Sequence, residues 1–247
     1  MSPLRIAIIS DIHANLHALD AVLAALEDDP PDAIWNLGDT VGYGPRPNEC
    51  CALAAKRAQL SLVGNHDLVV LGSSGVDVDE FNPEAAAAAT WTRDALTEEA
   101  RAFLEGLSPS ADRDGVEMYH GSPRDPVWEY VLTVEAARAA FLGTEAPVVL
   151  VGHSHVPLAL RLEGAEVLGG LAKHGTEVDL SSARWLLNPG SVGQPRDGDP
   201  RAAYCLLDLD TQRVSFVRAE YAIDETQAEM REQGLPTALA ERLAYGA

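Results

Sequence analysis

Lysine is nearly absent from this chain of 247 residues: Lys56 and Lys173 are its only lysines, and 18 basic residues face 38 acidic ones. The formal net charge is −20. A field of this sign repels polyanions, and no basic stripe interrupts it. The composition therefore disfavours nucleic acid as a routine partner.

Cysteine and long apolar runs are also scarce. The three cysteines, Cys50, Cys51 and Cys205, are too few for a disulfide framework and form no paired motif for zinc, so we interpret them as reduced, buried thiols. No apolar run approaches the roughly 18 residues of a spanning helix, and the first apolar stretch, residues 6–9, is too short for a signal-peptide core. We predict a cytoplasmic protein with no membrane partner.

The composition is that of a globular protein, with 47% hydrophobic and 23% charged residues. The length suffices for a full core. No internal repeat, low-complexity linker or composition shift marks a boundary, so we predict a single domain over residues 1–247. The sequence leaves the oligomeric state open.

The first 155 residues alternate between short apolar runs and helical periodicity, which favours a largely parallel sheet covered by helices. The expected strands are 4–9, 33–37, 60–63, 116–119 and 147–151. The expected helices are about 16–26 and 47–58, with two more beginning after Asn82 and Thr97. After Pro157 the pattern changes to turn-linked strands that should pair antiparallel. These strands are 158–162, 167–168, 178–180, 185–187, 203–209 and 214–217, followed by helices near 224–233 and 236–244.

Polar side chains with metal-ligand character follow all five strands of the first part. They are Asp11 and His13, then Asp39, then Asn65 and His66, then His120, and finally His153 and His155. Each fragment alone is weak evidence, because a buried, hydrogen-bonded histidine is a commoner explanation for any single one. In open α/β sheets, however, the carboxyl ends of strands meet at one edge, so the five sets can converge. We interpret the remaining histidines, His17 and His174, as structural or solvated.

Imidazole nitrogens, carboxylate oxygens and one amide oxygen, without any thiolate, suit Mn²⁺, Fe, Ni²⁺ or Zn²⁺. Seven of these side chains are already too many ligands for one small ion. Two ions about 3.5–4 Å apart that share one carboxylate would use them all and would hold a bridging hydroxide as nucleophile. Two divalent ions outweigh the negative charges of two carboxylates and one hydroxide. The centre therefore keeps a net positive charge, which predicts an anionic phosphoryl group as the substrate.

The ordered motifs Asp11-Ile12-His13, Gly38-Asp39, Gly64-Asn65-His66-Asp67, His120 and Gly152-His153-Ser154-His155 resemble those of the calcineurin-like metallophosphoesterase superfamily. The likeness covers residues 6–155 with every ligand motif present. The segment Asn188–Gly193 is similar to that of the small bacterial and archaeal phosphodiesterases and extends the likeness to about residue 205.

The resemblance implies a four-layer α/β/β/α sandwich of two stacked mixed sheets flanked by helices. It implies a dinuclear centre with Asp39 bridging, one ion held by Asp11, His13 and His155, and the other by Asn65, His120 and His153. The resemblance also implies that His66 binds no ion and instead stabilises or protonates the leaving oxygen. Such a role typically increases the rate by about 10²–10⁴-fold.

Substrate contacts should come from loops beyond the strand ends, and the candidates are Tyr43, Arg46, Arg124 and Arg196. We predict hydrolysis of a small or nucleotide-type phosphodiester. A phosphomonoesterase remains the alternative. The phosphoprotein phosphatases of this superfamily carry an acidic residue and an arginine just after the Gly-Asp motif, where this chain has Thr40–Gly44. This departure argues against a dedicated phosphoprotein phosphatase. A non-catalytic scaffold and a nuclease also remain; the intact ligand set argues against the first and the acidic charge against the second.

Overall fold

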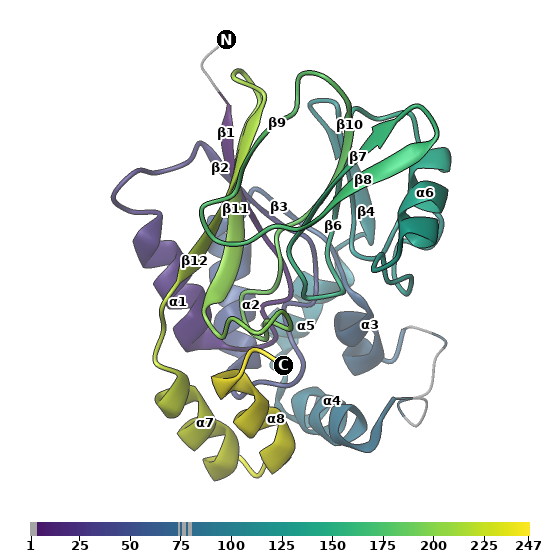
Figure 1. The fold of residues 1–247 in the computed structure, drawn as a ribbon. Helices are drawn as coiled ribbons and strands as arrows, with labels where there is room; N and C mark the ends of the chain where they lie inside the picture. The colour runs from purple at the N-terminus through teal and green to yellow at the C-terminus, as the bar shows by residue number, and fades with distance from the viewer. Residues whose placement is uncertain (1–3, 74, 76–77, 79–80) are drawn as a thin grey trace.

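The computed structural model describes residues 4–73, 75, 78 and 81–247 (Figure 1). In this part of the chain, two six-stranded sheets are flanked by eight α-helices. None of the described helices combines the length and the apolar character that crossing a membrane would require.

The first sheet has the strand order β3-β2-β1-β11-β12-β9. Strands β1, β2 and β3 are parallel to one another, whereas β11, β12 and β9 are added antiparallel. The bounds are β1 Arg5–Ile9, β2 Ala33–Asn36, β3 Leu60–Ser61, β9 Glu177–Asp179, β11 Ala202–Asp208 and β12 Arg213–Ala219. The carboxyl ends of β1, β2 and β3 therefore lie at the same edge of this sheet.

The second sheet has the order β4-β5-β6-β10-β7-β8. Strands β5, β6 and β10 run parallel, and antiparallel strands complete both sides. The bounds are β4 Ser110–Arg113, β5 Val116–Tyr119, β6 Val148–Val151, β7 Leu158–Glu163, β8 Glu166–Leu171 and β10 Arg184–Asn188. Each sheet is mixed, as the resemblance implied.

The β1 sequence shows why its residues are almost all apolar. Successive side chains of a strand point to opposite faces. Ile6 and Ile8 enter a core that also contains Met118 and Leu150 of the second sheet, so the two sheets pack face to face. Ala7 and Ile9 enter a second core, between the first sheet and α1. Both faces of β1 are thus covered, and an uninterrupted apolar run is what such a strand needs.

The helices cover the outer faces of the sheets and one end of the molecule (Figure 1). Their bounds are α1 Leu16–Ala25, α2 Pro47–Arg57, α3 Asn65–Leu71, α4 Pro83–Ala95, α5 Glu98–Glu105, α6 Val134–Leu142, α7 Ile223–Glu232 and α8 Thr237–Glu241, which continues as the 3₁₀ turn η2, Arg242–Ala244. Helix α1 contacts β11 and β12, and α6 contacts β7 and β8. The side chains of Asn82 and Thr97 accept hydrogen bonds from the first turns of α4 and α5, which confirms both predicted starts.

The four-layer α/β/β/α fold predicted from the sequence is confirmed. Three elements were not foreseen: α3, β4 and α6. Helix α3 begins directly at Asn65, so the polar residues interpreted as the end of a strand form the first turn of a helix. Helix α6 starts at a capping threonine, Thr133, whose hydroxyl accepts the N–H of Ala136. That cap was readable in the sequence and was missed.

Candidate metal centre

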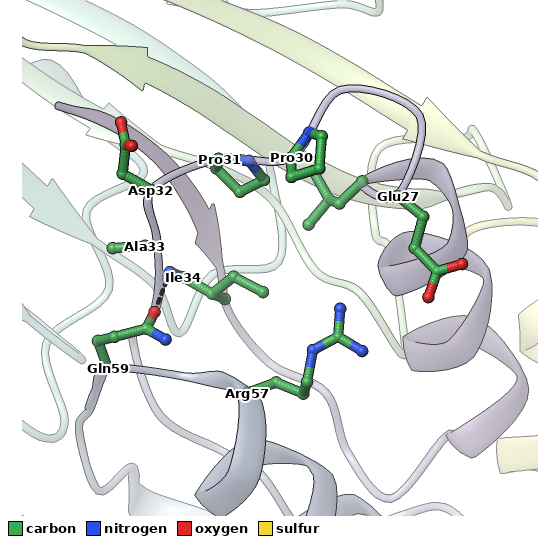
Figure 2. A pocket seen from close by; sticks show the side chains of 9 residues that line it. Glu27, Pro30, Pro31, Asp32, Ala33, Ile34, Arg57 and Gln59 are labelled. Carbon is green, nitrogen blue, oxygen red and sulfur yellow. Dashed lines mark hydrogen bonds between the residues drawn. The ribbon is translucent and has the colours of Figure 1, made fainter. Parts of the chain in front are cut away.

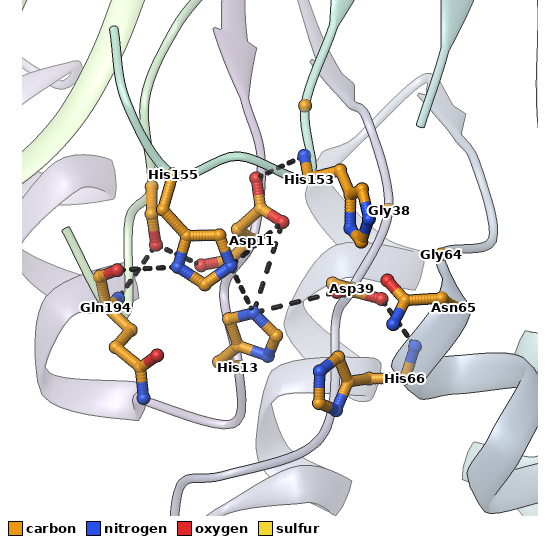
Figure 3. Close-up of polar contacts among 12 residues, drawn as sticks. Asp11, His13, Gly38, Asp39, Gly64, Asn65, His66, His153, His155 and Gln194 are labelled. Atoms are coloured by element: carbon orange, nitrogen blue, oxygen red, sulfur yellow. Dashed lines mark hydrogen bonds and ion pairs between the residues drawn. The ribbon is translucent and has the colours of Figure 1, made fainter. Parts of the chain in front are cut away.

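The polar residues after β1, β2, β3, β5 and β6 converge on one place, where the carboxyl ends of strands from both sheets meet, and Figure 3 shows those after β1, β2, β3 and β6. Two groups of side chains there each bring their ligand atoms within 4.8 Å of one another. The first is Asp11, His13, Asp39 and His155, and the second is Asp39, His120 and His153. All are buried, and Asp39 belongs to both groups.

In the first group, the carboxylate and imidazole atoms face a common point. His155 Nε2 lies 3.5 Å from Asp11 Oδ1, and His13 Nε2 lies 3.6 Å from Asp39 Oδ2. The two Nε2 atoms of His13 and His155 are 3.0 Å apart. These separations are those of ligands around a small ion rather than of a packed apolar core.

In the second group, His120 Nε2 lies 3.5 Å from the same Asp39 Oδ2 and 3.0 Å from Asn65 Oδ1. The sequence prediction had placed Asn65 with His120 and His153, and the structure brings its amide oxygen to that position. The other carboxylate oxygen of Asp39 accepts the backbone N–H of His66 at 2.9 Å. Only Oδ2 of Asp39 is therefore left to face both groups.

The orientation of the imidazoles is fixed by backbone carbonyls. Nδ1 of His13, His120 and His155 lies 3.1, 2.9 and 2.6 Å from the carbonyls of Val41, Leu37 and Gln194. A carbonyl can only accept, so each Nδ1 carries a proton, and in the neutral ring Nε2 presents a lone pair to the site. His153 is held the other way round, because its Nε2 donates to the Trp128 carbonyl at 3.2 Å and leaves Nδ1 free.

The site fits a cation. Asp11 Oδ1 and Asp39 Oδ2 are buried, and neither accepts a hydrogen bond from the described residues. The lone pairs of His13 and His155 face each other across 3.0 Å, which is unfavourable unless a positive charge lies between them. The nitrogen and oxygen donors, with no sulfur, match divalent transition metals.

The backbone of the site is strained where it carries these ligands. Asp11, His13, Asp39, His153 and His155 all have φ between 49° and 63°, the left-handed region that residues other than glycine rarely adopt. Such strain persists where surrounding structure imposes it, and it concentrates at functional sites. The packing here is also close: a Cβ at Gly64 would lie 2.1 Å from Asp39 Oδ1, so that position requires glycine.

Burial and neighbouring charges determine the protonation of the site. Burial alone would raise the pKa of Asp39, but the imidazoles of His120, His66 and His13 outweigh it and hold that pKa below its usual range. Burial would likewise lower the pKa of His120, but Asp39 raises it to about 9. Burial lowers the pKa of His153 to about 3 and that of His155 well below its usual range. Most of these imidazoles are therefore neutral at neutral pH, with lone pairs available to a metal.

His66 lies beside the two groups and in neither of them. Its ring is 5.0 Å from that of His13 and 4.4 Å from that of Tyr43, and its Nδ1 is buried without a hydrogen-bond partner among the described residues. Burial lowers its pKa to about 4, so the ring is neutral at neutral pH and one of its nitrogens carries a proton. The ring of Phe81 also packs against the His66 ring, at 5.0 Å.

Two polar residues support the site in ways that the sequence reasoning missed. Asp67 accepts the N–H of Gly64 and of Val41, both at 2.9 Å, and so ties the start of α3 to the loop after Asp39. Gln194 supplies the carbonyl that orients His155. Asp67 stood in the Gly64–Asp67 motif, and its position at the third residue of a helix was the available signal.

The four predicted substrate contacts lie in different environments. Arg196 lies 5.9 Å from the centre of the Tyr43 ring, which in turn packs on His13 and His66, so both residues border the site. Arg46 is engaged by Glu229, at 2.9 and 2.8 Å. Arg124 is exposed and paired with Glu129. A substrate contact by Arg46 or Arg124 requires these ion pairs to open.

A cavity of about 230 Å³, lined by Glu27, Pro30, Ile34 and Arg57, lies away from this site (Figure 2). Ile34 lies in the amino-terminal half of β2, and its N–H donates to Gln59 Oε1 at 2.6 Å, whereas Asp39 follows the carboxyl end of that strand. This cavity therefore opens at the opposite edge of the sheet.

Two stacked mixed sheets with a buried Asp/His cluster at the carboxyl ends of their strands define a fold and a candidate metal centre, and a comparison with known families assigns them to a class. Residues 4–212 match the calcineurin-like phosphoesterase superfamily domain. The chain belongs to this family, which confirms the resemblance seen in its motifs and the expectation of a phosphoric ester hydrolase.

Several proteins are similar to this chain. An uncharacterized protein of Methanocaldococcus jannaschii, MJ0912, is 38% identical over 247 residues, which covers 98% of each chain. The phosphodiesterase YfcE of Escherichia coli is 26% identical over 213 residues, 85% of this chain and 91% of YfcE. The crystal structure of a metallophosphoesterase from Sphaerobacter thermophilus covers all of both chains with a TM-score of 0.90 and 46% identity.

Proposed function

We propose that this protein is a dinuclear metal-dependent phosphodiesterase that acts on a small or nucleotide-type phosphodiester. The observation that carries the proposal is the pair of ligand groups that share Asp39. One shared carboxylate between two sets of imidazoles is the arrangement that a two-ion site requires. The name of the similar YfcE, a phosphodiesterase, supports the diester class.

Asp11, His13 and His155 would hold one ion, Asn65, His120 and His153 the other, and Asp39 both. Mn²⁺, Fe, Ni²⁺ and Zn²⁺ suit these donors. When bound, two such ions would polarise the phosphoryl oxygens and lower the pKa of a water, which becomes the nucleophile at neutral pH. The carbonyls of Leu37, Val41 and Gln194 keep three of the imidazoles aimed at the ions.

His66 would act on the leaving oxygen. Its side chain borders the ligand groups without a hydrogen-bond partner among the described residues, and its main-chain N–H is fixed by Asp39 Oδ1. A neutral imidazole at this position can donate its N–H to the alkoxide or aryloxide that departs. The rings of Tyr43 and Phe81 pack against its ring at 4.4 and 5.0 Å.

Arg196 is the substrate contact that the geometry favours. Its guanidinium lies over Tyr43, and one terminal nitrogen donates to Gln194 Oε1 at 2.9 Å. Burial raises the pKa of Asp11 to about 7 and lowers the pKa of His13, His66 and His155, and the positive charge of Arg196 acts on all four groups. A guanidinium so placed would pair with a non-bridging phosphate oxygen.

The test is hydrolysis of bis(p-nitrophenyl) phosphate and of p-nitrophenyl phosphate by metal-stripped protein reloaded with Mn²⁺. We expect metal-dependent turnover with a higher kcat/KM on the diester. His66→Ala should lose most of it, whereas the matched control His174→Ala, an exposed histidine outside the site, should not. A higher kcat/KM on the monoester would favour a phosphomonoesterase. No turnover in protein that binds two ions would favour a non-catalytic scaffold.

A further inference from the structure

One exposed aromatic ring lies directly on the candidate metal centre. Tyr130 stacks on the ring of His153, with the ring centres 3.8 Å apart and the ring planes at 21°. His153 is a member of the second ligand group, and yet Tyr130 is 47% exposed. An aromatic ring that has one face packed and much of its surface in water can stack on a second planar group. The structure thus presents an open aromatic surface beside the ligand groups.

The site meets solvent on the same side. Asp11, Asp39 and His120 are fully buried, whereas His66 and His153 are the most exposed of the ligand candidates and their neighbour, at 5% and 3%. A substrate has to enter where the buried site meets solvent. Part of a substrate bound at the ligand groups should therefore lie near His153 and against the ring that packs on it.

Tyr130 ends a loop that begins at another ligand, His120, and this loop is held in place. The Asp125 carboxylate accepts the N–H of Trp128 at 3.0 Å, and the Trp128 carbonyl accepts a hydrogen bond from His153 at 3.2 Å. The position of the Tyr130 ring is therefore set before a substrate binds. A ring held in this way loses little conformational freedom on binding, which favours affinity.

Other aromatic side chains gather on this side of the site. Aromatic residues make up only 6% of the chain. Even so, the ring of Phe81 lies 5.0 Å from that of His66 and 6.2 Å from that of Trp128, and Tyr130 follows two residues later. Aromatic rings attract planar groups, and stacking on them is the usual way in which proteins bind unpaired nucleobases. These surroundings favour a substrate that carries a planar aromatic group.

Tyr130 and the residue assigned to the leaving oxygen contact different ligand groups. His66 packs on His13, of the first group, and on Tyr43, whereas Tyr130 packs on His153, of the second. In Figure 3, His66 and His153 lie on either side of the shared Asp39. A group that stacks on Tyr130 is therefore on the side of the substrate that stays on the phosphate.

We propose that Tyr130 determines specificity by stacking on the nucleobase of a nucleotide-type phosphodiester, on the side that stays on the phosphate. This inference rests on the proposed function and selects the nucleotide-type esters as its substrate class. Tyr130 contributes to binding and takes no part in proton transfer or bond cleavage. Stacking tolerates any base, so nucleotides with different bases should bind alike.

The first test is calorimetry of the Mn²⁺-loaded protein with thymidine 5′-monophosphate and with 2-deoxyribose 5-phosphate, which lacks the base. We expect the nucleotide to bind about tenfold more tightly, which is within the usual strength of base–aromatic stacking. Tyr130→Leu should lose this preference, whereas Tyr130→Phe, which keeps the ring, should retain it. Tyr245→Leu, at a tyrosine that is 71% exposed near the end of the chain, is the control and should match wild type.

The second test compares thymidine 5′-(p-nitrophenyl phosphate) with methyl p-nitrophenyl phosphate, which has the same leaving group and no base. Tyr130→Leu should raise KM about tenfold for the nucleoside compound, with kcat unchanged and both ions retained in elemental analysis. An equal rise in KM for the two compounds, or the loss of an ion, would refute the role in specificity, because the ring would then act on the leaving group or on His153.

The two tests separate this inference from the proposed function. Absence of turnover in protein that shows the Tyr130-dependent preference for the nucleotide would refute the phosphodiesterase and support the stacking site. Turnover of the diester without that preference, or with a preference that survives in Tyr130→Leu, would refute the stacking role and leave the phosphodiesterase supported.

Discussion

Replacing Asp39 by asparagine tests the shared carboxylate at constant side-chain volume. In the structure Oδ1 of Asp39 accepts the His66 N–H at 2.9 Å, so the amide oxygen of the substituted side chain would keep that bond. The amide nitrogen would then point at the position that Oδ2 shares between His13, at 3.6 Å, and His120, at 3.5 Å. An amide nitrogen has no lone pair for a metal and carries N–H groups that repel it.

The expected loss is large because one oxygen serves both ions. Changes that only reorient a ligand typically cost about 10–100-fold in metal affinity. Removing an anionic ligand common to two ions should cost more than about 100-fold for at least one of them. A ligand present at about 100 times its Kd stabilises the folded state by about 2.7 kcal/mol, so this contribution should disappear from the variant.

The assay is elemental analysis after equilibration with Mn²⁺ and desalting, combined with thermal unfolding with and without the ion. Wild type should retain two ions per chain and unfold at a higher temperature when loaded. D39N should retain fewer than two and gain less from the ion, whereas the exposed control D28N should match wild type. Two fully occupied sites in D39N would refute the bridging role of Asp39.

Three further changes test other parts of the structure. His66→Ala should lower kcat on a phosphodiester by about 10²–10⁴-fold with unchanged metal content, measured by steady-state kinetics and elemental analysis; an unchanged rate would contradict its role at the leaving oxygen. Glu229→Gln removes the charged partner of Arg46 and should lower the free energy of unfolding by about 1 kcal/mol in urea denaturation, a small value because the pair is partly exposed; no change would mean that the pair does not fasten α7. Hydrogen bonds from Arg201 lower the pKa of Asp199 from 3.8 to about 2, so its stabilisation is complete above pH 3.8 and is lost as the pH falls through about 2. Asp199→Asn should therefore cost about 1 kcal/mol at neutral pH and less in acid near that pKa, and an equal cost under both conditions would contradict this linkage.

The sequence indicated the fold class through two patterns that depend on local physics. Runs such as Ile6–Ile9 are apolar at every position, which is required when a strand is covered on both faces. Helix starts such as Asn82 and Thr97 carry side chains that cap the first turn, and both were predicted. What the patterns did not show was α3, because the polar ligand Asn65 is also its first helical residue.

The arrangement of the two sheets was beyond the sequence patterns. Strands β1 to β3 belong to one sheet, and β5 and β6 belong to the other. In the sequence, however, all five have the same pattern, an apolar run followed by polar residues. Sheet membership is set by long-range pairing, such as that of Arg5 in β1 with Asp208 in β11, near the other end of the chain. Such pairings depend on the packing of the whole core.

For the site, the chain itself determined which residues are ligand candidates, because chemistry and position at strand ends are both properties of the sequence. The family resemblance implied how they divide, but only the tertiary structure supplied the contacts behind that division. It brought Asp39 into both ligand groups, fixed each imidazole by a carbonyl from another loop, and engaged Arg46 with Glu229 across 183 positions. It also returned the carboxyl-terminal helices to Tyr43. Contacts between residues so far apart depend on the completed fold, and no local pattern encodes them.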